Sequence, residues 1–179
     1  RVKSLYFAPV SAAPAGASAA YLIFRQLARK ACPGVWYGLG RARQYGYGVK
    51  PNPEKAEKYY RHAAKLGHAE AQESLGLLYE FAEKPDYRRA RKWYARAAAQ
   101  CRRDATFAIV RLGHLYEHGL GGKKDVQAAL KYYRRAAKLG DADAQNAIGF
   151  LYDTGRGVRQ SYKRALKWYA RAATGSFHD

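Results

Sequence analysis

The sequence lacks acidic residues over its first 53 positions, since the first one is Glu54. Methionine is absent altogether, even at the first position, which indicates a processed or trimmed product. The opening stretch combines many Ala and Ser residues with basic ones, namely Arg1, Lys3, Arg25, Arg29 and Lys30. This composition is typical of an organellar transit sequence or of what remains beside one. A basic, alanine-rich tail is the alternative.

Long hydrophobic runs are also missing. No apolar stretch reaches the ~20 residues that a helix needs to cross a membrane, and Pro9 and Pro14 interrupt the best candidate. We therefore expect no membrane insertion.

Catalytic and metal-binding groups lack partners at a useful spacing. The carboxylate pairs Glu73 and Glu80, and Asp141 and Asp143, are most simply solvated charges at helix starts, where the helix dipole favours acids. His114 and His118 lie four apart, a spacing that can hold a metal, but HLYEH is not HExxH and no third ligand is evident.

The glycines at 119–122, followed by two lysines, resemble a phosphate-binding loop only superficially. A P-loop requires a preceding strand and a terminal GK[ST], and both are missing. We expect no enzyme, no cofactor, no bound metal and no small-molecule substrate.

What the sequence does contain is a repeat. Gly40, Gly76, Gly113 and Gly149 are spaced by 36, 37 and 36 residues, and each lies in the first helix of a similar two-helix pattern. A period in the thirties with two helices per unit predicts an all-α solenoid. We expect helix pairs at 34–45 and 53–66, 69–81 and 87–99, 104–118 and 125–139, and 142–153 and 161–173, with an extra helix near 19–31.

Small and aromatic residues predict how the helices of a pair meet. Gly76 and Gly113 allow two helix backbones to approach, so we expect both at helix–helix contacts that exclude a side chain. Trp93 and Trp168 should fill the space between layers and not lie fully exposed.

The pattern LGxxY, then GxGV, then KAxxWYxxAAxxG closely resembles the Sel-1-like repeat, a relative of the tetratricopeptide repeat. The resemblance runs from Gly34 to about Gly175, with several positions matching in register in four copies. It implies a right-handed superhelix of antiparallel helix pairs that binds other proteins, and it does not imply an enzyme.

The expected organisation is one solenoid over residues 18–175, between an extended arm (1–17) and a tail (176–179). A degenerate half-repeat covers 18–33, because its apolar positions match those of the next second helix when shifted by 36. Four repeats follow at 34–67, 68–103, 104–140 and 141–175.

The second repeat departs from the pattern at its two loops. Its inter-helix turn at 81–85 lacks the usual glycines, and its exit at 99–104 is longer and has Cys101 in place of glycine. Loop changes of this kind mark a binding surface or reflect neutral drift.

Cysteine is scarce, with only Cys32 and Cys101. The secreted branch of the resembling family carries a cysteine pair in each repeat. At ~10 Å per packed layer, the two cysteines would lie roughly 20 Å apart, too far for a disulfide. A reducing compartment is therefore expected.

Basic residues concentrate on the second helix of each repeat, and the formal net charge is +19. Pairs four residues apart share one helix face, and we expect both Arg135 and Arg171 to be exposed. The candidate RNA- or polyanion-binding residues are Lys58, Lys92, Arg96, Lys131, Arg135, Lys167 and Arg171. A long basic ridge matches a phosphate backbone, whereas the alternative is a solubilising surface whose side-chain stems cover aromatic rings.

Three functions remain open. The first is a structural subunit of an organellar ribonucleoprotein, in particular a mitochondrial ribosome, that bridges RNA and neighbouring proteins in the mitochondrial matrix. The second is a protein-only adaptor or assembly factor for a respiratory complex or protein quality control. A cytoplasmic location is the alternative to the mitochondrial matrix. The third is a hydrolase, an activity proposed for the secreted branch, which the missing cysteine pairs make doubtful.

Overall fold

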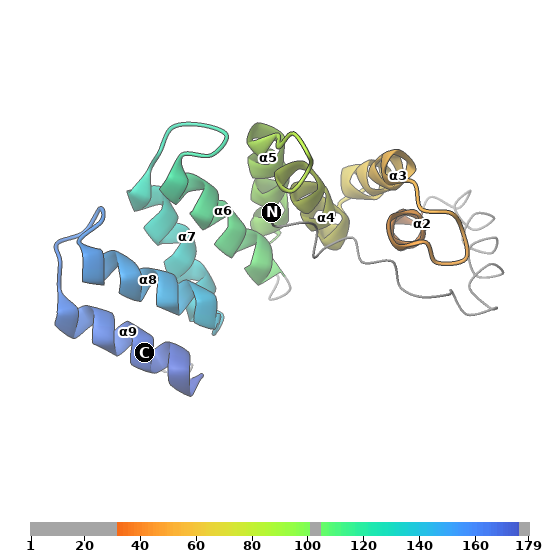
Figure 1. The fold of residues 1–179 in the computed structure, drawn as a ribbon. Coiled ribbons are helices and arrows are strands. Elements are labelled where there is room, and N and C mark those ends of the chain that lie inside the picture. The colour runs from red at the N-terminus through yellow and green to blue at the C-terminus, as the bar shows by residue number, and fades with distance from the viewer. Residues whose placement is uncertain (1–31, 101–104, 176–179) are drawn as a thin grey trace. The chain divides into compact units, whose positions relative to one another are not determined.

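The computed structural model of the chain describes residues 32–100 and 105–175 (Figure 1). These residues form eight α-helices and no strand. The helices are α2 (Pro33–Tyr45), α3 (Pro53–Lys65), α4 (Ala69–Glu80), α5 (Tyr87–Ala99), α6 (Thr106–His118), α7 (Val126–Lys138), α8 (Ala142–Thr154) and α9 (Tyr162–Thr174).

Each helix lies within two residues of its predicted bounds, so the prediction of four helix pairs is confirmed. The expected arm at 1–17, the helix near 19–31, Cys101 and the tail at 176–179 lie outside the described residues. The chain divides within α4 into two compact units, residues 1–75 and 76–179. The expectation of one continuous solenoid domain stays a prediction.

Side-chain caps and glycines define the helix ends. Asp86, Asp125 and Asp141 each accept a hydrogen bond from the backbone N–H three residues later, at 2.7–2.9 Å. Such caps satisfy backbone donors that a helix start leaves without a partner. Gly119 and Gly155 end α6 and α8 in the left-handed conformation, which glycine adopts without steric cost.

In the unit that ends at residue 75, α2 packs against α3. The ring of Tyr60 lies directly over Gly40, and Leu39 and Ala42 are buried beside it. The start of α4 is held on α3 by Gln72, whose Nε2 donates to the backbone oxygen of Ala64 at 3.0 Å.

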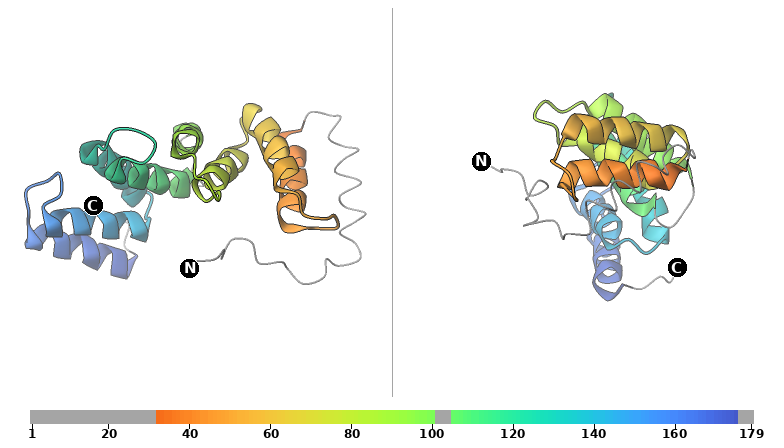
Figure 2. Two further views of the ribbon diagram at one scale, coloured as in Figure 1. Left: turned by 45° about the horizontal axis from the view of Figure 1, so that its top comes forward. Right: turned by 90° about the vertical axis from the view of Figure 1, so that its right-hand side faces the viewer.

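In the unit that begins at residue 76, each helix from α5 to α9 packs against the next along the chain. Figures 1 and 2 show α8 and α9 side by side and antiparallel. The core of this unit is aliphatic and aromatic, and its largest fully buried side chains are Tyr94, Ile109, Leu112, Leu115, Ile148 and Leu151.

A tyrosine packed on a glycine joins the two helices of each repeat. A Cβ atom added to Gly113 would lie 2.7 Å from the ring of Tyr133, and one added to Gly76 would lie 2.4 Å from the ring of Tyr94. The prediction that both glycines lie where no side chain fits is confirmed. Trp93 is buried and Trp168 is half-buried, as expected.

Candidate basic interface

Basic and acidic residues are segregated between helices in the unit that begins at residue 76. Helix α5 carries five Lys or Arg residues, α7 and α9 carry four each, and none of the three helices contains an acid. Helix α8, in contrast, contains two acids and no Lys or Arg. The second helices therefore concentrate positive charge that no acid on the same helix neutralises.

One lysine recurs at the same register position of every second helix. Lys58, Lys92, Lys131 and Lys167 each come two residues before the tyrosine that packs on glycine. All four are exposed, and none forms a hydrogen bond or ion pair with a described residue. Their ammonium groups are available to a partner.

Arginines four residues after two of these lysines lie over tryptophan rings. The guanidinium carbon of Arg96 is 4.8 Å from the ring centroid of Trp93, and that of Arg171 is 4.9 Å from Trp168. The stacked arginine shields an aromatic face from water while its charge stays at the surface. The alternative interpretation, in which basic stems cover aromatic rings, therefore describes part of this surface.

Arg135 occupies the same register position but behaves differently. It is half-buried, and its Nη2 donates to the backbone oxygen of Ala98 at 2.5 Å. Arg171 is also half-buried. The expectation that both arginines are exposed is wrong, because one is tied to the end of α5 and the other lies against Trp168.

The repeat pattern explains the bond of Arg135. Gln72 and Gln145 donate to the backbone oxygens of Ala64 and Ala137, which lie in the last turns of α3 and α7. The corresponding residue of the third repeat is the buried Ile109, which cannot donate. Arg135 reaches the equivalent carbonyl of Ala98 from α7, the second helix of the following repeat. A free carbonyl at this buried helix end would cost stability.

The acids near the ends of α4 and α6 are buried. Glu80 is 5% exposed and Glu117 is 8% exposed, so the prediction that Glu80 is a solvated charge at a helix start is wrong. Each lies four residues after the repeat glycine and therefore on the same helix face. Their Oε2 atoms accept hydrogen bonds from Tyr94 and Tyr133, both at 2.8 Å.

These contacts change the ionisation of the tyrosines. Burial, followed by the adjacent carboxylate, raises the pKa of Tyr94 and of Tyr133 well above the ordinary value. Both hydroxyls therefore remain protonated donors. The glycine admits the tyrosine ring, and the side chain one turn later holds its hydroxyl. The four-residue spacing from glycine to Gln44, Glu80 and Glu117, which accept hydrogen bonds from the hydroxyls of Tyr60, Tyr94 and Tyr133, is visible in the sequence and could have revealed this bond.

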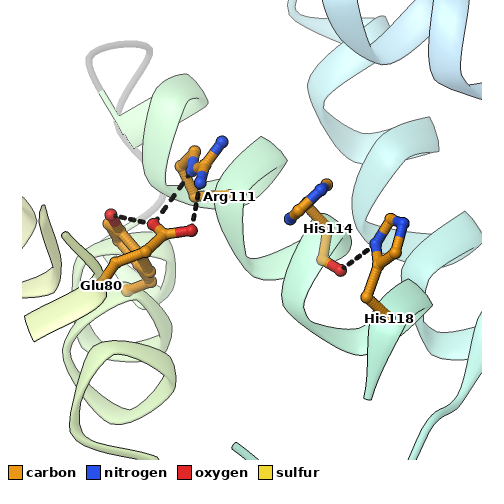
Figure 3. Close-up of polar contacts among 5 residues, drawn as sticks. Glu80, Arg111, His114 and His118 are labelled. Carbon is orange, nitrogen blue, oxygen red and sulfur yellow. Dashed lines mark hydrogen bonds and ion pairs between the residues drawn. The ribbon is translucent and has the colours of Figure 1, made fainter. Parts of the chain in front are cut away.

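Glu80 also pairs with Arg111 of α6 (Figure 3). The Nε of Arg111 donates to Glu80 Oε2 at 3.1 Å, and Nη2 donates to Oε1. Burial opposes the charge of Arg111, but the hydrogen bond and charge of Glu80, together with Tyr94, outweigh burial and raise the pKa of the guanidinium. This bidentate contact links α4 to α6 across one repeat boundary.

The rings of His114 and His118 lie one turn apart on α6, with their centroids 4.2 Å from each other and their planes tilted by 35° (Figure 3). The Nδ1 of His118 lies 3.0 Å from the backbone oxygen of His114. Within residues 32–100 and 105–175, no three His, Cys, Asp or Glu side chains are grouped to hold a metal ion. Cys32 is exposed and free, and its separation from Cys101 stays a prediction.

None of the described helices is both long enough and apolar enough to cross a membrane.

Comparison with known proteins accounts for the repeats. Residues 37–68, 69–100, 106–141 and 142–177 match the Sel1 repeat. A solved Sel1 repeat protein from Oxalobacter formigenes superposes with a TM-score of 0.77 at 30% identity, covering 89% of this chain and 63% of that one.

Two curated relatives are similar over part of their length. Mouse DAP3-binding cell death enhancer 1 is 34% identical over 98 residues, which cover 55% of this chain and 19% of the relative. The uncharacterized protein NMB1327 of Neisseria meningitidis is 34% identical over 107 residues, covering 60% of this chain and 22% of the relative. The chain therefore spans about one fifth of the length of these relatives.

Four matched repeats, eight helices in the predicted pairs and the glycine–tyrosine contact inside each pair agree on one assignment. The chain belongs to the Sel1 repeat family of all-α solenoids, which serve as scaffolds for protein interactions.

Proposed function

We propose that this chain is a non-catalytic scaffold whose basic second helices bind RNA while other faces hold neighbouring proteins, as a structural subunit of an organellar ribonucleoprotein. One observation carries the proposal. Lys92, Lys131 and Lys167 recur in register on three helices that contain no acid, and all three are exposed and without partners among the described residues.

Such a surface suits a phosphate backbone for a physical reason. Exposed ammonium groups that are not neutralised locally can replace the counterions condensed on a polyanion, and the released counterions favour binding. Arg96 and Arg171 add two charges next to Trp93 and Trp168. Arg135 is left out of this surface, since its guanidinium is already bonded to Ala98. Lys58 belongs to the other unit and is proposed as a further contact.

The proposed compartment is the mitochondrial matrix and the proposed complex is the mitochondrial ribosome. The basic, acid-free start of the sequence supports the compartment. One relative is named for binding a protein, DAP3, which supports a protein partner for repeats of this similarity.

The test is a salt titration of RNA binding, followed by fluorescence anisotropy with single-stranded and double-stranded RNA. In the variant, Lys92, Lys131 and Lys167 are each replaced by Gln. Each lost phosphate contact lowers the slope of log K against log[salt] by about 0.7 for single strands and about 0.9 for duplexes. The triple variant should therefore have a slope smaller by about 2 to 3.

The matched control replaces Lys84, Lys123 and Lys124 by Gln. These lysines are also exposed but lie in loops between helices, so the control removes the same charge from another place. Its slope should stay close to that of the parent. Equal slopes for the parent and the register variant would contradict the proposal.

A protein-only adaptor is the second candidate, and exposed phenylalanines favour it. Phe107 and Phe150 lie on α6 and α8, and Phe81 directly follows α4. Such rings are typical anchors of protein interfaces. Sedimentation of the native protein with ribosomal particles, with and without ribonuclease, separates the two candidates. Sedimentation that ribonuclease abolishes supports the RNA-bound subunit, and absence from the particles supports the adaptor.

A further inference from the structure

Helix α9 exposes the residues that an internal second helix buries. Leu166 is 68% exposed, whereas Leu130, its counterpart 36 residues earlier in α7, is 3% exposed. Ala173 is exposed, whereas its counterpart Ala137 is buried. Tyr162, at the start of the same face, is exposed as well. A helix face that meets solvent carries polar residues at such positions, so these apolar residues indicate a face suited to contact with another helix.

In α7 this face is covered by α8. The two helices pack together, and the side of α8 that is buried includes Ala144 and Ile148. Gln145 of α8 also donates to the backbone oxygen of Ala137 at 3.5 Å. Because α9 repeats the sequence register of α7, its open face presents apolar residues at the positions that α8 covers on α7.

Charge restricts the chemistry of that helix. Helix α9 carries Lys163, Arg164, Lys167 and Arg171 and no acid. Helix α8, which occupies the equivalent face of α7, contains Asp143 and Asp153, no Lys or Arg, and is capped by Asp141. A second α9 would bring like charges together, which disfavours pairing of two copies through this helix.

We propose that the open face of α9, formed by Tyr162, Leu166 and Ala173, docks an acidic amphipathic helix of a partner protein in the way that α7 docks α8. The partner helix presents Ala and Ile or Leu along one stripe and acids beside it. This inference specifies a protein partner within the proposed scaffold function and is independent of RNA binding. Burial of apolar side chains would supply the affinity of this contact, and the basic residues of α9 would orient the partner helix.

The test uses a fluorescent peptide with the sequence of residues 141–155, DADAQNAIGFLYDTG, as the probe. Anisotropy should show saturable binding to the parent chain. Leu166→Glu should weaken the binding by about tenfold or more, because burial of one Leu contributes about 1.5–3 kcal/mol. Since Leu166 is exposed, the variant should keep the circular dichroism spectrum and melting temperature of the parent.

Leu66→Glu is the matched control. It makes the same chemical change at another exposed leucine, in the unit that ends at residue 75, and should leave peptide binding unchanged. A second peptide, with Asp141 and Asp143 replaced by Lys, should bind more weakly than the first. The RNA salt slope of Leu166→Glu should match that of Leu66→Glu, so failure of the docking site and failure of RNA binding remain distinguishable.

Three outcomes would overturn the proposal. The first is no peptide binding up to about 1 mM, which corresponds to only ~4 kcal/mol. The second is equal binding by Leu166→Glu and the parent, because the peptide would then contact another surface, such as the face of α7. The third is a dimer in analytical ultracentrifugation that Leu166→Glu dissociates, since a second copy would then cover α9.

Discussion

The contact between Gly113 and Tyr133 can be tested by adding a single methyl group. In Gly113→Ala the new Cβ would lie 2.7, 2.9 and 3.2 Å from three atoms of the Tyr133 ring. The ring is buried, and its hydroxyl is held by Glu117. It cannot rotate away, so α6 and α7 must move apart.

The expected cost follows from two opposing terms. Overpacking of a well-packed core costs typically 1–3 kcal/mol, whereas alanine stabilises a helix interior by about 1 kcal/mol relative to glycine. Because α7 is confined between α6 and α8, we expect the packing term to dominate. Gly113→Ala should lower the free energy of unfolding by about 1–2 kcal/mol.

Gly149 supplies a matched control in the same chain. Its added Cβ would also lie 2.7 Å from a ring, that of Tyr169 in α9. Helix α9, however, has an open outer face, as the exposure of Leu166 shows, and it can shift outward. The outward shift reduces the packing cost, whereas the helix-propensity gain is the same in both variants. The two terms should therefore nearly cancel, and Gly149→Ala should be close to neutral in stability.

Urea unfolding followed by far-ultraviolet circular dichroism measures both variants. The difference between their free energies of unfolding should be about 1–2 kcal/mol, with Gly113→Ala the less stable. If the two variants are equally stable, or if Gly149→Ala is the less stable, confinement of the second helix does not set the cost.

Two further predictions concern Arg135 and His114. Arg135→Met keeps the apolar stem but leaves the Ala98 carbonyl without this donor, so it should cost about 1–2 kcal/mol in urea unfolding, whereas Lys131→Met, an exposed control, should be neutral. Burial, with the nearby charges of His118 and Arg111, lowers the pKa of His114 below its ordinary value of 6.5. Below pH 6.5 the unfolded chain therefore binds more protons than the folded chain. The free energy of unfolding consequently decreases as the pH falls through this range. In His114→Gln the loss of melting temperature between about pH 7.5 and pH 5.5 should be smaller, and an unchanged loss would exclude His114 as its source.

Much of the fold follows from local spacing. The glycine period predicted four helix pairs, and every described helix lies within two residues of its expected bounds in the structure. It also predicted Gly76 and Gly113 at helix contacts, because only glycine gives room for an aromatic ring between two close backbones. The lysine register, from Lys58 to Lys167, is likewise a property of the repeat and was visible without coordinates.

Only the tertiary structure shows which of these side chains are exposed and which are buried or bonded to a neighbouring helix. Glu80 and Arg135 have the composition of surface residues, yet one is buried against Tyr94 and the other bonds a carbonyl of the preceding repeat. Leu166 repeats the position of the buried Leu130 and is exposed. Spacing within a repeat determines which residues share a helix face. Whether that face is covered depends on the neighbouring helix, and this is set by packing between repeats.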